Sequence, residues 1–189
     1  MRRTAHLLAT LALLSGCRGD QVPTEAIVRV QPQAAASQSP VTATQNRQLA
    51  ALRRATAPFQ NFGTATAAGW SAQITPCMTS AAGGMGFHYG NTALFDASVR
   101  VEAPELLLYE PDQNGRLRLV AVEYIIPYTA RSRSATPPVL FGLPFTRNDT
   151  FQLWGLHAWV WKDNPSGIFA DWNPRVTCAH TNNASDMAH

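Results

Sequence analysis

The sequence predicts an α+β fold in which an N-terminal kinked helix, or a pair of helices, packs on an antiparallel β-sheet. Three observations lead to this prediction. Apolar residues recur every three or four positions between 45 and 65, which is the spacing of one helical face. Two strand-like runs, 105–110 and 116–127, flank a turn cluster that contains Asn-Gly. A third strand-like run covers 151–161, and the alternation typical of a parallel βαβ fold is missing.

The helical segment carries a proline near its middle. Its apolar face consists of Leu49, Leu52, Thr56, Phe59, Phe62 and Ala65. Proline removes a backbone donor and interrupts a helix, but the apolar face keeps its phase on both sides of Pro58. We therefore expect a kinked helix or two abutting helices on one surface.

The predicted strands place ionisable side chains among apolar ones. In 116–127, alternation puts Glu123 on one face with Leu119, Ala121 and Ile125. In 151–161, one face carries Leu153, Gly155, His157, Trp159 and Trp161. Glu123 is thus a carboxylate in the middle of an otherwise apolar strand.

Two further segments are expected as loops. The stretch Gly-Gly-Met-Gly at 83–86 lacks the lysine and the following helix typical of phosphate-binding loops, so we expect a loop with tight backbone contacts. The segment 128–150 is predicted as a proline-containing loop with Arg131 and Arg133 exposed.

Residues 1–16 have the organisation of an export signal. Arg2 and Arg3 precede the apolar run 5–14, which is shorter than the roughly 20 residues that a permanent membrane-spanning helix requires. The small residues that follow complete the pattern. We therefore predict a cleaved signal peptide, and an exported protein.

The sequence Leu-Ser-Gly-Cys at 14–17 resembles the lipobox of bacterial lipoproteins. The resemblance implies that Cys17 is lipidated, with palmitate among its acyl chains, and becomes the first residue of the mature protein. Arg18 stands where an aspartate would resemble an inner-membrane retention signal, which favours the outer membrane or cell surface. Residues 17–44 are then the lipidated cysteine and a flexible linker, and 45–189 a single domain. An ordinary secretory peptide is the alternative.

The two other cysteines, Cys77 and Cys178, are predicted to form a disulfide, because an exported protein folds where disulfides persist. Such a bridge closes a loop of about 100 residues and stabilises by up to about 4.7 kcal/mol in the chain-entropy model. Two free thiols, or two thiolate metal ligands, are the alternatives. A single pair without CxxC spacing is a poor zinc signature.

Charge argues against nucleic acid as a partner. Removing Arg2 and Arg3 from the 15 basic residues leaves 13 against 12 acidic residues, a net charge of +1. The remaining basic residues are scattered, so they form no phosphate-binding track. The hydrophobic content of 46% is sufficient for one core.

His88, Glu123 and His157 are the candidate site residues, because each lies in an otherwise apolar segment. A buried carboxylate needs a cation, a hydrogen-bond donor or a raised pKa. Two neutral imidazoles and one carboxylate form a donor set for a divalent metal such as zinc or non-haem iron, with positions left for water or substrate. The predicted cofactor is accordingly a divalent metal.

Two other interpretations stay open, because the three residues form no local chelating motif such as HExxH. They are a buried polar cluster in which His88 pairs with Glu123, and an aromatic-lined ligand pocket. Tyr89, Trp159 and Trp161 are the candidate walls of that pocket.

Three motifs, GMGxHY at 84–89, VEY at 122–124 and LHxWxW at 156–161, resemble those of an uncharacterised family of bacterial exported proteins. The resemblance covers about 45–178 and implies a shared fold without naming a reaction. The leading function is an envelope lipoprotein with a small-molecule or metal-binding pocket. One alternative is a metal-dependent enzyme that uses the site of two histidines and one glutamate. The other is a non-catalytic structural or interaction protein of the envelope.

Overall fold

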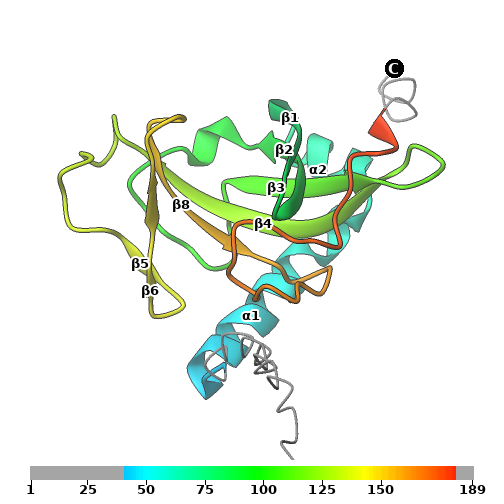
Figure 1. Cartoon of the computed structure of the whole chain (residues 1–189). Coiled ribbons are helices and arrows are strands. Elements are labelled where there is room, and N and C mark those ends of the chain that lie inside the picture. The colour runs from blue at the N-terminus through cyan, green and yellow to red at the C-terminus, as the bar shows by residue number, and fades with distance from the viewer. Residues whose placement is uncertain (1–40, 182–189) are drawn as a thin grey trace, which may run out of the picture. The chain divides into compact units, whose positions relative to one another are not determined.

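The structure, a computed structural model, describes residues 41–181. It has an α+β fold in which a helical layer packs on a curled antiparallel sheet, as predicted (Figure 1). The predicted lipidation site Cys17, the predicted signal peptide and nearly all of the predicted linker lie outside the described residues. Among the helices within 41–181, none has both the length and the apolar character that a membrane-spanning helix requires.

The helical layer consists of α1, η1 and α2, with bounds Ala43–Thr56, Ala57–Gln60 and Phe62–Ala67. The predicted break at Pro58 is confirmed, because a short 3₁₀ turn separates the two α-helices. Helix α1 begins two residues earlier than expected. Its cap explains the difference: the Thr42 side chain accepts a hydrogen bond from the Gln45 backbone, and the Gln45 side chain accepts one from the Thr42 backbone.

The main sheet has six antiparallel strands in the order β1-β2-β3-β4-β8-β7. Their bounds are Ala72–Ser80, Gly83–Gly90, Leu106–Pro111, Leu117–Pro127, Leu153–Ala158 and Thr146–Asn148. A separate two-stranded sheet pairs β5, Val139–Leu140, with β6, Leu143–Pro144, and a 3₁₀ turn, η2, covers Thr92–Leu94. The predicted hairpin corresponds to β3 and β4, and the predicted strand 151–161 to the shorter β8.

Two loop predictions are wrong. The Gly-rich stretch belongs to strand β2, which pairs with β1 on one side and β3 on the other, and 128–150 contains β5, β6 and β7. Backbone pairing with neighbouring strands overrides the low strand propensity of glycine. The expected close backbone contacts are present, since Gly84 exchanges two backbone hydrogen bonds of 3.0 Å with Asn173.

A bulge at Gly86 sets which side chains of β2 face each side of the sheet. Met85 and His88 are three residues apart, and regular alternation would put them on opposite faces. Gly86 has φ +85°, and a Cβ there would lie 2.4 Å from the Tyr109 carbonyl oxygen. The β1–β2 register also shifts between Met78 and Thr79, whose partners are Gly86 and Gly84, so β2 has one extra residue, Met85, at this point. As a result both Met85 and His88 face the same cavity.

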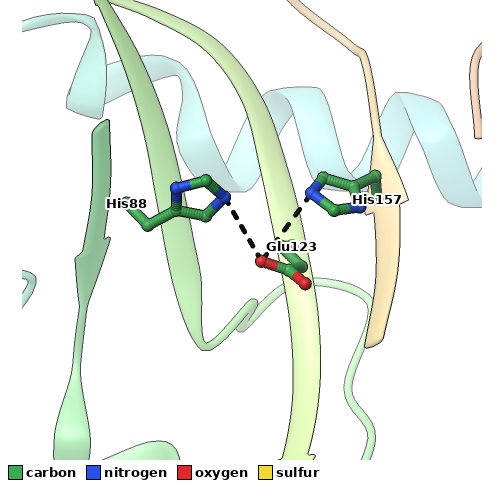
Figure 2. Close-up of side chains that lie close together, drawn as sticks. All are labelled: His88, Glu123 and His157. Carbon is green, nitrogen blue, oxygen red and sulfur yellow. Dashed lines mark ion pairs between the residues drawn. The ribbon is translucent and has the colours of Figure 1, made fainter. Parts of the chain in front are cut away.

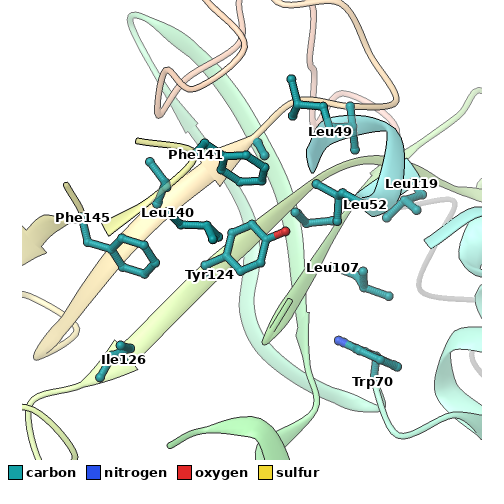
Figure 3. Close-up of a cluster of buried hydrophobic side chains, with 14 of the residues drawn as sticks. Leu49, Leu52, Trp70, Leu107, Leu119, Tyr124, Ile126, Leu140, Phe141 and Phe145 are labelled. Atoms are coloured by element: carbon teal, nitrogen blue, oxygen red, sulfur yellow. The ribbon is translucent and has the colours of Figure 1, made fainter. Parts of the chain in front are cut away.

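The two faces of the sheet carry different side chains. On the helix face, a large apolar cluster includes Leu49 and Leu52 from α1 and Leu107, Tyr124 and Ile126 from the sheet (Figure 3). We call the other face the cavity face. Its apolar cluster is smaller and consists of Leu106, Leu108, Val120, Ala121, Ile125, Trp159 and Val176.

The C-terminal segment is tied to the cavity side of the sheet. The predicted disulfide is confirmed: Cys77 in β1 bonds to Cys178, with Cα atoms 5.8 Å apart. Glu110 in β3 accepts a 2.8 Å hydrogen bond from the Thr177 backbone and pairs with Lys162. These ties hold the segment against β1–β3.

Candidate metal centre

His88, Glu123 and His157 converge on the cavity face from three different strands (Figure 2). They come from β2, β4 and β8, and 4, 7 and 5% of their respective surfaces are exposed. One nitrogen of each histidine and one oxygen of the glutamate lie within 4.8 Å of one another. The structure therefore brings together the three residues that the sequence singled out.

The sheet topology explains this convergence. Glu123 and His157 are directly paired across β4 and β8, where cross-strand side chains are neighbours. His88 is two strands away from Glu123, because β3 lies between β2 and β4. Flat strands would leave about 10 Å between these two backbones. The curl of the sheet and the length of both side chains close that distance.

Gly155 provides the space for the carboxylate. It lies on β8 two residues before His157, on the same face and diagonal to Glu123. A Cβ at position 155 would lie 2.9 Å from Oε1 of Glu123. A larger residue there would displace the carboxylate.

Each histidine has a polar partner behind it. Nδ1 of His88 lies 2.8 Å from the Thr75 hydroxyl oxygen, and Nδ1 of His157 lies 3.5 Å from Oδ1 of Asp171. A carboxylate at Nδ1 holds the proton on that nitrogen and leaves the lone pair on Nε2, an arrangement that metal-binding histidines use. In both residues Nε2 is the nitrogen that faces Glu123.

The spacing of the three groups matches the space between ligands of one metal ion. Nε2 of His88 lies 3.5 Å, and Nε2 of His157 3.7 Å, from Oε2 of Glu123. Both distances exceed a good hydrogen bond. Two ligands about 2.1 Å from a tetrahedral metal are themselves about 3.4 Å apart. Both histidine–glutamate distances thus lie close to the separation that a shared metal ion imposes.

Nε2 of His157 is a buried polar atom without a hydrogen bond. Among the described residues, it is the buried side-chain nitrogen or oxygen for which no hydrogen-bond partner is found. Leaving such a group unsatisfied costs about 1–3 kcal/mol. A metal ion would satisfy this atom, and the adjacent Glu123 and His88 would complete the coordination.

The electrostatics of the cluster favour a positive charge at its centre. Burial, followed by the nearby His157, lowers the pKa of His88 to about 3, so this ring is neutral at physiological pH. Burial also acts to lower the pKa of His157, but the carboxylates of Glu123 and Asp171 outweigh it and the pKa is raised. Burial raises the pKa of Glu123, against the opposing effect of His157. A divalent cation would supply the charge that these groups favour.

A cavity of about 120 Å³ reaches the cluster from outside. All three candidate ligands contribute to its walls, together with Ile74, Thr75, Met78, Met85, Leu106, Asn148, Phe151, Leu153 and Trp172. Pockets for drug-sized ligands usually measure about 300–1,000 Å³. This cavity therefore suits a metal ion with a small ligand.

The predicted aromatic walls lie elsewhere. Tyr89 faces the helix side, where its ring packs 4.6 Å from Phe62. Trp159 stacks on His157, but its indole donates to the Ala170 carbonyl oxygen outside this cavity. The indole of Trp161 donates to the Thr56 hydroxyl on α1.

The expectation that Trp161 shares a face with His157 is wrong, because β8 ends at Ala158 and regular alternation ends with it. Trp159 and Trp161 together line a different cavity, of about 350 Å³, with Arg53 and Lys162. The histidines do not border that cavity.

Sequence reasoning missed the partners of the two histidines. Thr75 lies in β1, a strand that contains a proline and several polar residues. Asp171 lies in a turn-rich segment. Neither has a sequence pattern that points to a histidine. The thioether residues Met78 and Met85 were also missed, because the bulges that turn them toward the cavity are not visible in the alternation.

Comparison with known proteins identifies no relatives. No family model matches the chain, and no curated protein or solved structure matches it significantly. The geometry of the site is therefore the basis for assigning a function.

Proposed function

We propose that this domain binds a divalent metal ion through Nε2 of His88, Nε2 of His157 and the carboxylate of Glu123. The observation that carries the proposal is the buried Nε2 of His157, which lacks a hydrogen bond and lies 3.7 Å from Glu123. Two imidazoles and a carboxylate are typical ligands of zinc and of non-haem ferrous iron. Each of the three motifs that resemble the exported family supplies one of these ligands.

Three protein ligands leave at least one coordination position for a small molecule. The cavity that reaches the cluster gives such a molecule access to the metal. The proposed function is therefore metal-dependent binding of a small ligand, and the enzyme alternative requires in addition a reaction at that position.

We also propose that the protein is exported and anchored to the bacterial envelope through a lipid on Cys17, with the outer membrane or cell surface favoured. The lipobox resemblance supports the anchor. The disulfide between Cys77 and Cys178 supports an oxidising compartment, because cytosolic proteins rarely keep structural disulfides.

The metal proposal is tested by elemental analysis of the protein purified without a polyhistidine tag. We expect near-stoichiometric zinc or iron in the parent protein, and its loss in His88→Ala and His157→Ala. His180→Ala is the matched control, because this histidine lies outside the cluster and its variant should keep the metal. Circular dichroism identifies variants that fail to fold.

Two results would count against the metal proposal. One is a parent protein that takes up no zinc, iron or cobalt even when refolded with an excess of the ion. The other is full metal content in folded His157→Ala, which would place the ion elsewhere.

The anchor proposal has a separate test. Processing of the precursor should be blocked by globomycin, and radioactive palmitate should label the protein at Cys17. If Cys17→Ser remains in the membrane fraction to the same extent as the parent protein, the lipid anchor is wrong.

A further inference from the structure

The cavity that reaches the proposed metal is lined mainly by apolar side chains. Apart from the three candidate ligands, its polar side chains are Thr75 and Asn148. Thr75 already contacts His88, and the side-chain oxygen Oδ1 of Asn148 accepts a hydrogen bond from the Phe151 backbone. A ligand with many hydroxyl groups would leave them without partners in such a cavity. The body of the ligand should therefore be apolar.

The charge of the site sets the charge of the ligand. A divalent ion and the Glu123 carboxylate together carry a net charge of +1. Among the described residues, those that line the cavity include no lysine or arginine. Asp171 stands behind His157, and with 57% of its side chain exposed its charge is largely solvated. One negative charge on the ligand neutralises the centre, whereas a second would be buried without a partner.

Exposed apolar side chains mark the outer end of the cavity. Ile74 and Phe151 are 38 and 46% exposed, and both belong to the walls of this cavity. Ile74 lies in β1 and Phe151 in the turn between β7 and β8, so they approach the cavity from opposite edges of the curled sheet. They provide apolar contacts for the part of a ligand that extends beyond the small interior.

We infer that the metal centre takes a small monocarboxylate with an apolar tail, whose carboxylate occupies the open metal position and whose tail points toward Ile74 and Phe151. This inference rests on the proposed function. It adds the chemical class of the ligand to the metal site, and it involves no covalent step.

The test uses the cobalt(II)-substituted full-length protein, because the visible spectrum of cobalt reports both metal uptake and changes in coordination. Acetate, butyrate and hexanoate are titrated in turn, with butyl phosphate and butylammonium as controls. We expect carboxylates to change the spectrum, with affinity rising roughly threefold to fourfold for each methylene group that is buried. Butyl phosphate should bind at least tenfold more weakly than butyrate, and butylammonium should have no effect.

Variants locate the tail. Phe151→Ala should weaken hexanoate binding by roughly 3- to 10-fold and leave acetate unchanged, because only the longer tail reaches the outer end. Val139→Ala is the matched control: this valine is also an exposed apolar residue, but it lies in β5 and outside the cavity. Its variant should bind hexanoate as the parent does.

The outcomes separate the two proposals. If the protein binds neither cobalt nor zinc or iron, both the metal site and the proposed ligand are wrong. Cobalt that binds and is lost in His157→Ala, but whose spectrum ignores all carboxylates, would keep the metal site and overturn the ligand class. An equal response to acetate and hexanoate, or a stronger one to butyl phosphate, would also overturn the inference.

Discussion

The helix face and the cavity face of the sheet are built from the same strands but are stabilised in different ways. In β4, Val122, Tyr124 and Ile126 pack under the helical layer, while Glu123 faces the cavity. The helix face gains its stability from buried apolar area. The cavity face has a smaller apolar cluster. It is held by the disulfide, by the hydrogen bond that Glu110 accepts from the Thr177 backbone, and by the one that Asn173 donates to the Asp163 carbonyl oxygen.

The difference follows from what each face has to accommodate. A face packed to the density of a protein interior leaves no room for a ligand. The walls of a cavity next to a sheet must therefore be held in place by disulfides and hydrogen bonds around the cavity. On this view, substitutions on the helix face should reduce folding stability, and substitutions on the cavity face should act on binding.

The largest expected effect is on the helix face. Leu52 is fully buried under the sheet, and Leu52→Ala should lower the free energy of unfolding by about 2–5 kcal/mol. Urea denaturation measures the change. The folded fraction should keep its metal content, so a variant that loses metal while remaining folded would contradict the division between the faces.

A second buried carboxylate, Glu105, sharpens the comparison with Glu123, because no histidine of residues 41–181 acts on its pKa. It accepts a 3.1 Å hydrogen bond from the Ile125 backbone, and burial raises its pKa from 4.5 to about 8. Between these values the folded protein holds a proton that the unfolded chain has released. Stability should therefore fall as pH rises from about 4.5 to 8, by a few kcal/mol at most.

Glu105→Gln keeps a side-chain oxygen that accepts the hydrogen bond from the Ile125 backbone, but it has no carboxyl group to titrate. The stability of this variant should therefore change less than that of the parent protein between pH 5 and pH 8. Denaturation in the presence of a chelator keeps the metal site out of the comparison. Glu102→Gln is the control, because this neighbouring glutamate is exposed and its variant should follow the parent. An unchanged pH dependence in Glu105→Gln would exclude Glu105 as its source.

The disulfide on the cavity side should contribute slightly less to the free energy of unfolding than Leu52 does. Cys77 and Cys178 are separated by 101 positions, and replacing both with alanine should cost about 2–4 kcal/mol. Because Trp172 in the tied segment lines the cavity, hexanoate binding should weaken as well. Equal stability of the parent under oxidising and reducing conditions would show that the tie contributes nothing.

The smallest expected effect concerns Asp171, the carboxylate partner of the proposed metal ligand His157. Asp171→Asn should weaken metal binding by about 10- to 100-fold, because the amide orients His157 less strongly than the carboxylate does. Asp163→Asn is the control, since Asp163 is exposed and pairs with Arg175. Competition with a chromogenic chelator measures both affinities. In the metal-free state the two variants should unfold at the same urea concentration, because the difference between them lies in metal affinity.

The parts of the fold that were predictable follow regular periods. The apolar face of 45–65 and the alternation in β4 gave the helical layer and the position of Glu123 because both depend on local geometry. Strand β1 was not predictable, since it contains Pro76, which lacks a backbone donor. Its place at the edge of the sheet explains why the proline is tolerated.

The candidate site was predictable only as a set of residue types. His88, Glu123 and His157 stand out because each is ionisable in an apolar segment. Their distances depend on strand order, curl and the bulge at Gly86, which arise from pairings between residues far apart in the sequence. The contact between Asp171 and His157 depends on the path of the C-terminal segment. Local periodicity in the sequence does not predict that path.

Gly155 shows that an absent side chain can define a site as much as a present one. With glutamate and histidine paired across two strands, the residue two places before the histidine determines where the carboxylate rests. A designer who wished to transplant this centre into another antiparallel sheet would need four positions and not three. The fourth would specify an empty volume, and a search for similar sites would gain selectivity by requiring glycine there.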